Sequence, residues 1–107
     1  MCSSDLGGAV EAEVRKRGFS VVRVLTGHGI GRTIHEDPMV PNWADPGART
    51  KITEGLVITI EPILAMGGGE SWEDDDGWTI RTTDGSLASH FEHTIVVTDG
   101  EPLLLTE

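Results

Sequence analysis

The apolar run at residues 56–63 constrains the fold more than any other segment, and a single carboxylate, Glu61, interrupts it. A near-continuous run of this length, rich in β-branched residues, is typical of a strand covered on both faces. An ionised carboxylate placed there needs a cation or several hydrogen-bond donors. Pro62 follows directly and has no N–H to donate. The alternative is that Glu61 lies at the end of the strand and reaches solvent.

A second carboxylate, Glu92, lies in a segment with the pattern of a strand, residues 91–98. Period-two alternation places Glu92 on the same face as Thr94 and places His93 on the opposite face. The sequence therefore predicts two half-buried strand carboxylates.

A histidine flanked by glycines, His28, lies in the segment 27–31, and His35 follows seven residues later. Glycine permits close backbone approach, so the imidazole of His28 can be aimed at a small target. On this segment alone, a loop histidine is the simpler interpretation. Together with Glu61 and Glu92, however, His28 forms a set of oxygen and imidazole ligands that suits Mn²⁺, Fe²⁺, Co²⁺ or Zn²⁺. The combination predicts a metal site.

The remaining pattern predicts an α+β chain with a mainly antiparallel sheet and few helices. Residues 8–17 have the charge order and the terminal glycine of a short helix. The other predicted elements are strands at 19–25, 77–83, 91–98 and 103–105, extended segments within 31–40, and an acidic turn or loop at 70–76.

Charge and composition exclude several classes of partner. Residues 52–107 carry twelve acids and only one basic residue, Arg81, within a chain of formal net charge −10. This balance repels phosphate backbones, so we expect no nucleic-acid partner. We expect no membrane partner either, because no stretch approaches the ~20 apolar residues of a membrane span. The single cysteine, Cys2, permits no internal disulfide and fits a cytoplasmic location.

Four segments in series carry a resemblance to a known family. Residues 27–38 and 57–62 resemble the methionine aminopeptidase and prolidase superfamily, peptidase family M24. Residues 77–86 and 91–98 narrow the resemblance to the type I methionine aminopeptidases. The resemblance implies that residues 9–107 form the C-terminal half of a pita-bread (creatinase/aminopeptidase) catalytic domain. Residues 1–8 are expected to be a non-native or ragged N-terminus.

The resemblance also implies roles for individual residues. His28, Glu61 and Glu92 match metal ligands of a centre with two divalent ions (Co, Mn, Fe or Zn), and Glu61 is also expected to take part in proton transfer. His35 matches a catalytic histidine that contacts the substrate. Trp78 matches an aromatic residue near the methionine pocket, although a packing role explains it equally well.

The implied activity is that of a methionyl aminopeptidase, a monomeric metalloexopeptidase that removes the N-terminal methionine from nascent polypeptides. The family's two further ligands, both aspartates, and a second substrate-contacting histidine have no counterpart before His28. We therefore expect the N-terminal half of the enzyme to be missing here, and the chain alone to be inactive and poorly soluble. The alternatives are a non-catalytic binding protein of the same fold and a standalone small metal-binding domain.

Overall fold

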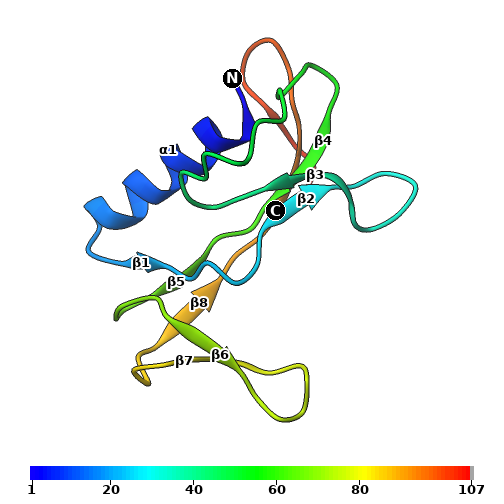
Figure 1. Ribbon diagram of the computed structural model, residues 1–107. Coiled ribbons are helices and arrows are strands. Elements are labelled where there is room, and N and C mark those ends of the chain that lie inside the picture. Colours follow the sequence, from blue (N-terminus) through cyan, green and yellow to red (C-terminus); the bar gives the residue numbers. More distant parts are fainter. Residues whose placement is uncertain (107) are drawn as a thin grey trace.

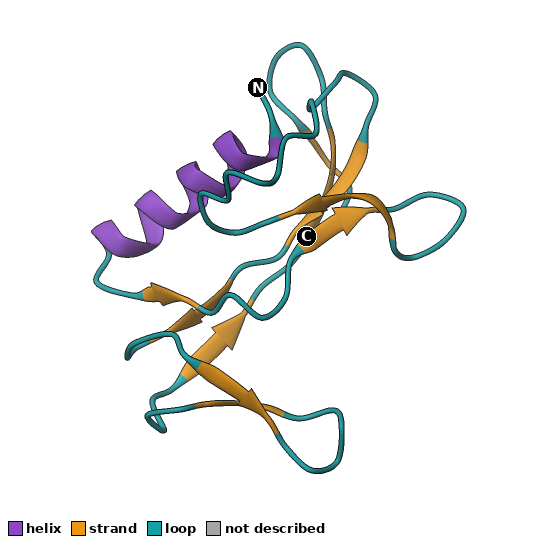
Figure 2. Cartoon of the chain, in the orientation of Figure 1, coloured by secondary structure: helices purple, strands orange, loops and turns teal. Residues whose placement is uncertain are grey.

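The computed structural model describes residues 1–106, in which one N-terminal helix precedes a series of short strands (Figures 1 and 2). The elements are α1 (Ser3–Lys16), β1 (Ser20–Val21), β2 (Gly27–Gly29), β3 (Glu36–Val40), β4 (Val57–Ile60), β5 (Ile63–Ala65), β6 (Ser71–Glu73), β7 (Ile80–Thr82), β8 (Ala88–His90), β9 (His93–Val96) and β10 (Leu103–Leu104).

The largest sheet has five strands in the order β10-β9-β4-β2-β3, and each neighbouring pair is antiparallel. Strand β4 lies in its centre, with β9 on one side and β2 on the other. Ile58 of β4 is paired with Ile95 of β9 and with Gly29 of β2. The predicted mainly antiparallel sheet with few helices is confirmed.

The two faces of this sheet differ in character. On one face, Val40, Ile58 and Ile95 form the buried core, and Leu6 of α1 packs against them. Helix α1 therefore covers this face, as Figure 1 shows. Side chains alternate between faces along a strand, so Thr59 and its cross-strand partner Thr94 project from the opposite face.

Two smaller sheets continue from the large one. Strands β1, β5 and β8 form a three-stranded sheet, and β6 and β7 form a separate hairpin. The pairing of Ile60 with His93 and the pairing of Ile63 with His90 have the same register. The segment that runs from β4 into β5 is therefore aligned with the segment that runs from β8 into β9 in one continuous antiparallel register. This register places Glu61 opposite Glu92.

Helix α1 begins at Ser3, five residues earlier than predicted. The carboxylate of Asp5 accepts the backbone N–H of Cys2 at 2.8 Å, and the N–H of Ser3 donates to the Thr50 carbonyl at 2.8 Å. A carboxylate in the first turn also interacts favourably with the positive end of the helix dipole. The origin of residues 1–8 stays a prediction, whereas their conformation is helical from Ser3 onward.

The strand predictions need three corrections. The segment 56–63 is two strands rather than one, because Pro62 lacks an N–H and interrupts the ladder. The acidic segment 70–76 is not only a loop, because β6 pairs with β7 around a turn in which Gly77 donates to the Asp74 carbonyl at 3.0 Å. The predicted strand at 19–25 shortens to two residues, and β8 was not predicted at all.

Candidate metal centre

Three neighbouring strands bring His28, Glu61 and Glu92 together. His28 lies in β2, Glu61 directly follows β4 and Glu92 directly precedes β9. Each residue offers one ligand atom, and these atoms all lie within 4.8 Å of one another. The cluster projects from the face opposite α1, so the sheet itself separates it from the hydrophobic core.

The hydrogen bonds of His28 reveal which of its ring nitrogens can bind a metal. Its Nδ1 lies 2.8 Å from the carbonyl oxygen of Gly29, which only accepts, so Nδ1 carries the proton and donates it. In a neutral imidazole, Nε2 then presents a lone pair, and it lies 3.1 Å from Oε1 of Glu61. Two lone pairs that face each other at this distance need a cation or a proton between them. A ring N–H that donates to a backbone carbonyl is also the usual arrangement for a metal-binding histidine.

Glu61 is the buried member of the cluster, with 9% of its surface exposed. Glu92 is exposed, so the prediction of a half-buried carboxylate is wrong at this position. The hydroxyl of Thr59 donates to its Oε1 at 2.9 Å. The amide of Asn42, which is fully buried, lies 3.4 Å from the Glu61 carbonyl oxygen and donates to it. The carboxylate of Glu61 is therefore buried and accepts the Thr59 hydroxyl, and the alternative that it reaches solvent is wrong.

Glycines allow β2 to lie close to its neighbours. A Cβ at Gly27 would lie 2.2 Å from the carbonyl oxygen of Thr59, and a Cβ at Gly29 would lie 2.1 Å from that of Asp37. No side chain fits at either position without separation of the strands. The two glycines therefore fix His28 against β4 on one side and β3 on the other.

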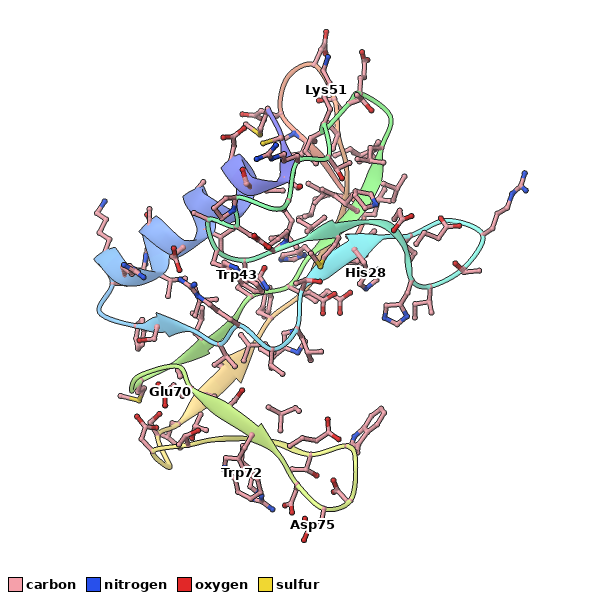
Figure 3. All side chains as sticks on the ribbon, viewed as in Figure 1. His28, Trp43, Lys51, Glu70, Trp72 and Asp75 are labelled. Carbon is pink, nitrogen blue, oxygen red and sulfur yellow. The ribbon has the colours of Figure 1, made fainter. Side chains whose placement is uncertain are left out.

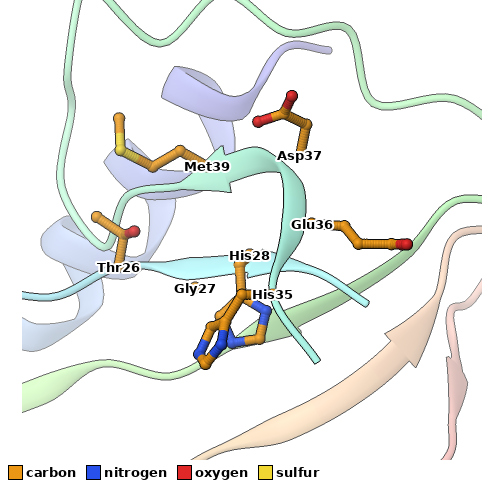
Figure 4. Close-up of a pocket in the computed structure, with 7 residues that line it drawn as sticks. All are labelled: Thr26, Gly27, His28, His35, Glu36, Asp37 and Met39. Atoms are coloured by element: carbon orange, nitrogen blue, oxygen red, sulfur yellow. The ribbon is translucent and has the colours of Figure 1, made fainter. Parts of the chain in front are cut away.

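An open pocket of about 720 Å³ adjoins the cluster, and Figure 4 shows its lining residues. The rings of His28 and His35 lie side by side in it, with centroids 4.3 Å apart. His35 is exposed, and its role as a residue that contacts the substrate stays a prediction. Glu36 instead stabilises the preceding turn, because its Oε1 accepts the N–H of Arg32 at 3.0 Å.

Trp78 is not brought to this pocket. It lies in the turn between β6 and β7, is 87% exposed, and does not line the pocket around His28. In Figure 3, Trp72 and Asp75 mark this hairpin, well away from His28. The proposed role of Trp78 in methionine binding stays a prediction.

His90 was missed by the sequence analysis. Its Nε2 lies 3.2 Å from Oε2 of Glu61, on the side of the carboxylate away from His28. The signal that would have revealed it is its spacing of two residues from Glu92. Because this spacing places both side chains on one face of a strand, His90 and Glu92 project toward the same site.

His28, Glu61 and Glu92 form a candidate metal site on one face of an antiparallel sheet. The sequence profile of metallopeptidase family M24 matches residues 1–99, and the chain belongs to this family. No helix among residues 1–106 has the length and apolar character that a membrane crossing requires.

Within the family, the chain is similar to methionine aminopeptidases. It is 46% identical over 105 residues to the methionine aminopeptidase of Aquifex aeolicus. The match covers 96% of this chain and 41% of that protein. The crystal structure of methionine aminopeptidase from Thermotoga maritima superposes with a TM-score of 0.92 at 38% identity, over 100% of this chain and 43% of that one. The resemblance drawn from the four segments is confirmed, and the fold is the corresponding portion of the pita-bread fold.

A prolidase from Pyrococcus furiosus shares the fold at a TM-score of 0.68 and 23% identity, over 100% of this chain and 26% of that one. The TM-score is higher for the methionine aminopeptidase than for the prolidase. This difference agrees with residues 77–86 and 91–98, which resemble methionine aminopeptidases rather than prolidases. The chain spans only about two fifths of the length of the curated relatives it matches, 41% for the Aquifex aeolicus protein.

Proposed function

We propose that the full-length protein containing this chain is a metal-dependent methionyl aminopeptidase that removes the N-terminal methionine from nascent polypeptides. The single observation that carries the proposal is the distance of 3.1 Å between Nε2 of His28 and Oε1 of Glu61. The proton of the His28 ring lies on Nδ1, which donates to the Gly29 carbonyl. Membership of family M24 and similarity to methionine aminopeptidases support it.

The chain's own residues fit the divalent ions that this family uses. His28, Glu61 and Glu92 would hold them, as one imidazole and two carboxylates within 4.8 Å. This donor set suits Mn²⁺, Fe²⁺, Co²⁺ or Zn²⁺ better than softer metals. When bound, divalent ions make a water acidic enough to supply hydroxide near neutral pH and polarise the scissile carbonyl.

Two residues are proposed to act on the substrate. Glu61, which has only 9% of its surface exposed, holds and transfers the proton released by the attacking water. His35 is exposed beside His28 and would donate a hydrogen bond to the oxygen on which charge develops. His35 and His28 line the open pocket, and Nε2 of His28 lies 3.1 Å from Oε1 of Glu61, so a peptide N-terminus that enters the pocket would lie close to both residues.

The test measures release of free methionine from a Met-Ala-Ser peptide by the full-length protein with Mn²⁺ or Co²⁺. Glu61→Gln and Glu92→Gln keep the size of the side chain but remove its charge. Each is expected to lower kcat/KM at least about 100-fold, a loss of the order seen when acid–base or ligand groups are removed. The matched control is Glu101→Gln, at an exposed position outside the cluster.

The chain alone is expected to release no methionine, because His28, Glu61 and Glu92 provide only three of the ligands that the family resemblance implies for two ions. Measurable release by residues 1–107 under the same conditions would overturn this expectation. Wild-type function in the full-length protein after both glutamate substitutions would instead favour the non-catalytic binding protein of the same fold.

A further inference from the structure

Glu61 carries two carboxylate oxygens with different neighbours. Oε1 accepts the Thr59 hydroxyl at 2.9 Å and faces His28 Nε2 at 3.1 Å. Oε2 faces His90 Nε2 at 3.2 Å. Because an ionised carboxylate only accepts, the proton in this contact must lie on Nε2 of His90. Oε1 therefore belongs to the ligand cluster, and Oε2 accepts a hydrogen bond from His90.

The fold places His90 there by register. His90 ends β8 and is paired with Ile63 of β5, in the same alignment that pairs Ile60 with His93. Glu61 and Ile63 share a face of their strand, and so do His90 and Glu92. The imidazole of His90 therefore lies on the same face as the ligand cluster, one cross-strand diagonal from Glu61.

We infer that His90 is a positioning residue, which holds Oε2 of Glu61 so that Oε1 points at the metal site. This inference rests on the proposed function. The group of potential ligand atoms within 4.8 Å comprises His28, Glu61 and Glu92, whereas Nε2 of His90 contacts the other oxygen of Glu61, Oε2.

The physical need for this contact comes from the glutamate side chain. The last torsion of glutamate is broad, so an untethered carboxylate rotates and presents either oxygen or both. Thr59 alone restrains only Oε1, the oxygen that a metal would also occupy. A second donor, on Oε2, restrains the other oxygen and so fixes the plane of the carboxylate. Loss of such outer partners typically lowers metal affinity or activity about 10–100-fold.

The experiment compares His90→Leu, His90→Ala and His90→Gln in the full-length protein. Leucine and alanine remove the donor, whereas glutamine keeps an N–H at similar reach. The main readout is the Mn²⁺ dissociation constant, measured by competition with a chromogenic chelator. The melting temperature of the metal-free protein in EDTA reports any effect on folding. The matched control is His93→Gln, since Nδ1 of His93 instead donates to the Thr106 carbonyl at 3.0 Å.

We expect His90→Leu and His90→Ala to weaken Mn²⁺ binding about tenfold with an unchanged melting temperature in EDTA. His90→Gln should bind Mn²⁺ within about twofold of wild type, as should His93→Gln. Wild-type affinity in both donor-free variants would overturn the inference. Equal weakening in His90→Gln would also overturn it, because the imidazole itself would then be required.

The affinity readout separates this inference from the proposed function. A wild-type protein that binds Mn²⁺ tightly but releases no methionine contradicts the aminopeptidase proposal and leaves the role of His90 standing. The converse result, normal methionine release with no effect of His90→Leu and His90→Ala on affinity or kcat, contradicts only the role of His90.

Discussion

The hydroxyl of Thr59 donates to Oε1 of Glu61 at 2.9 Å, and the two residues lie on the same face of one chain segment. The same hydroxyl accepts the backbone N–H of His28 at 3.0 Å. Thr59 is fully buried. One hydroxyl group thus links two of the three proposed ligands and ties strand β2 to strand β4.

Thr59→Val should therefore weaken both the metal site and the fold. Valine has nearly the same shape but leaves the His28 N–H without its acceptor, which costs about 1–3 kcal/mol of stability. It also releases Oε1 of Glu61, so we expect Mn²⁺ affinity to fall about tenfold. Urea unfolding and chelator competition on the full-length protein measure the two effects.

Two controls accompany this variant. Thr59→Ser keeps the hydroxyl and should retain most of the affinity. Thr94→Val changes the cross-strand partner of Thr59 on the same face, where the side chain makes no recorded hydrogen bond within residues 1–106. Equal affinity loss in Thr94→Val would show that the effect comes from packing rather than from the hydroxyl.

Gly29→Ala should destabilise the protein by about 1–3 kcal/mol, because the added methyl group overpacks the sheet. Its Cβ would lie 2.1 Å from the Asp37 carbonyl oxygen, which forces β2 away from β3. Denaturant unfolding measures the loss. The matched control is Gly100→Ala, where a Cβ meets nothing within 4 Å. A Gly29→Ala variant as stable as Gly100→Ala would contradict the close approach of these strands.

The sequence predicted the centre of the site better than its surroundings. Glu61 and Glu92 stood out because a carboxylate within an apolar strand pattern requires a partner. His28 stood out through its glycine neighbours, and its combination with the two carboxylates predicted a metal site before the resemblance assigned individual roles. Local patterns of this kind are visible in the sequence because each carboxylate directly adjoins an apolar, β-branched strand, β4 or β9.

What the sequence did not reveal depends on long-range alignment. His90 lies in β8, whose three residues are all exposed and so show no apolar alternation. Its contact with Glu61 exists only because β5 and β8 pair in one particular register. Similarly, the early start of α1 depends on the Thr50 carbonyl, which is distant in the sequence. Periodicity can place His90 on the same face as Glu92, but it identifies neither Glu61 as the partner of His90 nor Thr50 as the partner of Ser3.

Ile58→Ala should be among the most damaging core substitutions. Ile58 is fully buried at the centre of the sheet, between Val40 and Ile95. Truncation of such a side chain costs about 2–5 kcal/mol, because it removes buried surface and leaves a cavity. Ile34→Ala, at a side chain that is 68% exposed, is the matched control and should change stability by less than about 0.5 kcal/mol. Similar losses in both variants would contradict the position assigned to the core.

The pH dependence of stability should show a contribution from Asp84. The N–H of Gly68 donates to its Oδ2 at 3.0 Å, and this bond, with further contributions from Ser86, lowers the pKa of Asp84 from 3.8 to about 2. A carboxyl group whose pKa is lower in the folded state stabilises the fold above its unfolded pKa. This contribution is complete above about pH 4 and is lost as the pH falls toward 2.

Asp84→Asn should therefore flatten the fall in stability between pH 4 and pH 2, the interval bounded by the unfolded and folded pKa values of Asp84. Thermal unfolding of the full-length protein at a series of pH values measures this slope. Asp99→Asn is the matched control, since Asp99 is exposed and its carboxylate accepts none of the hydrogen bonds recorded within residues 1–106. An unchanged slope in Asp84→Asn would show that this carboxylate does not stabilise the base of the β6–β7 hairpin, where Gly68 and Asp84 meet.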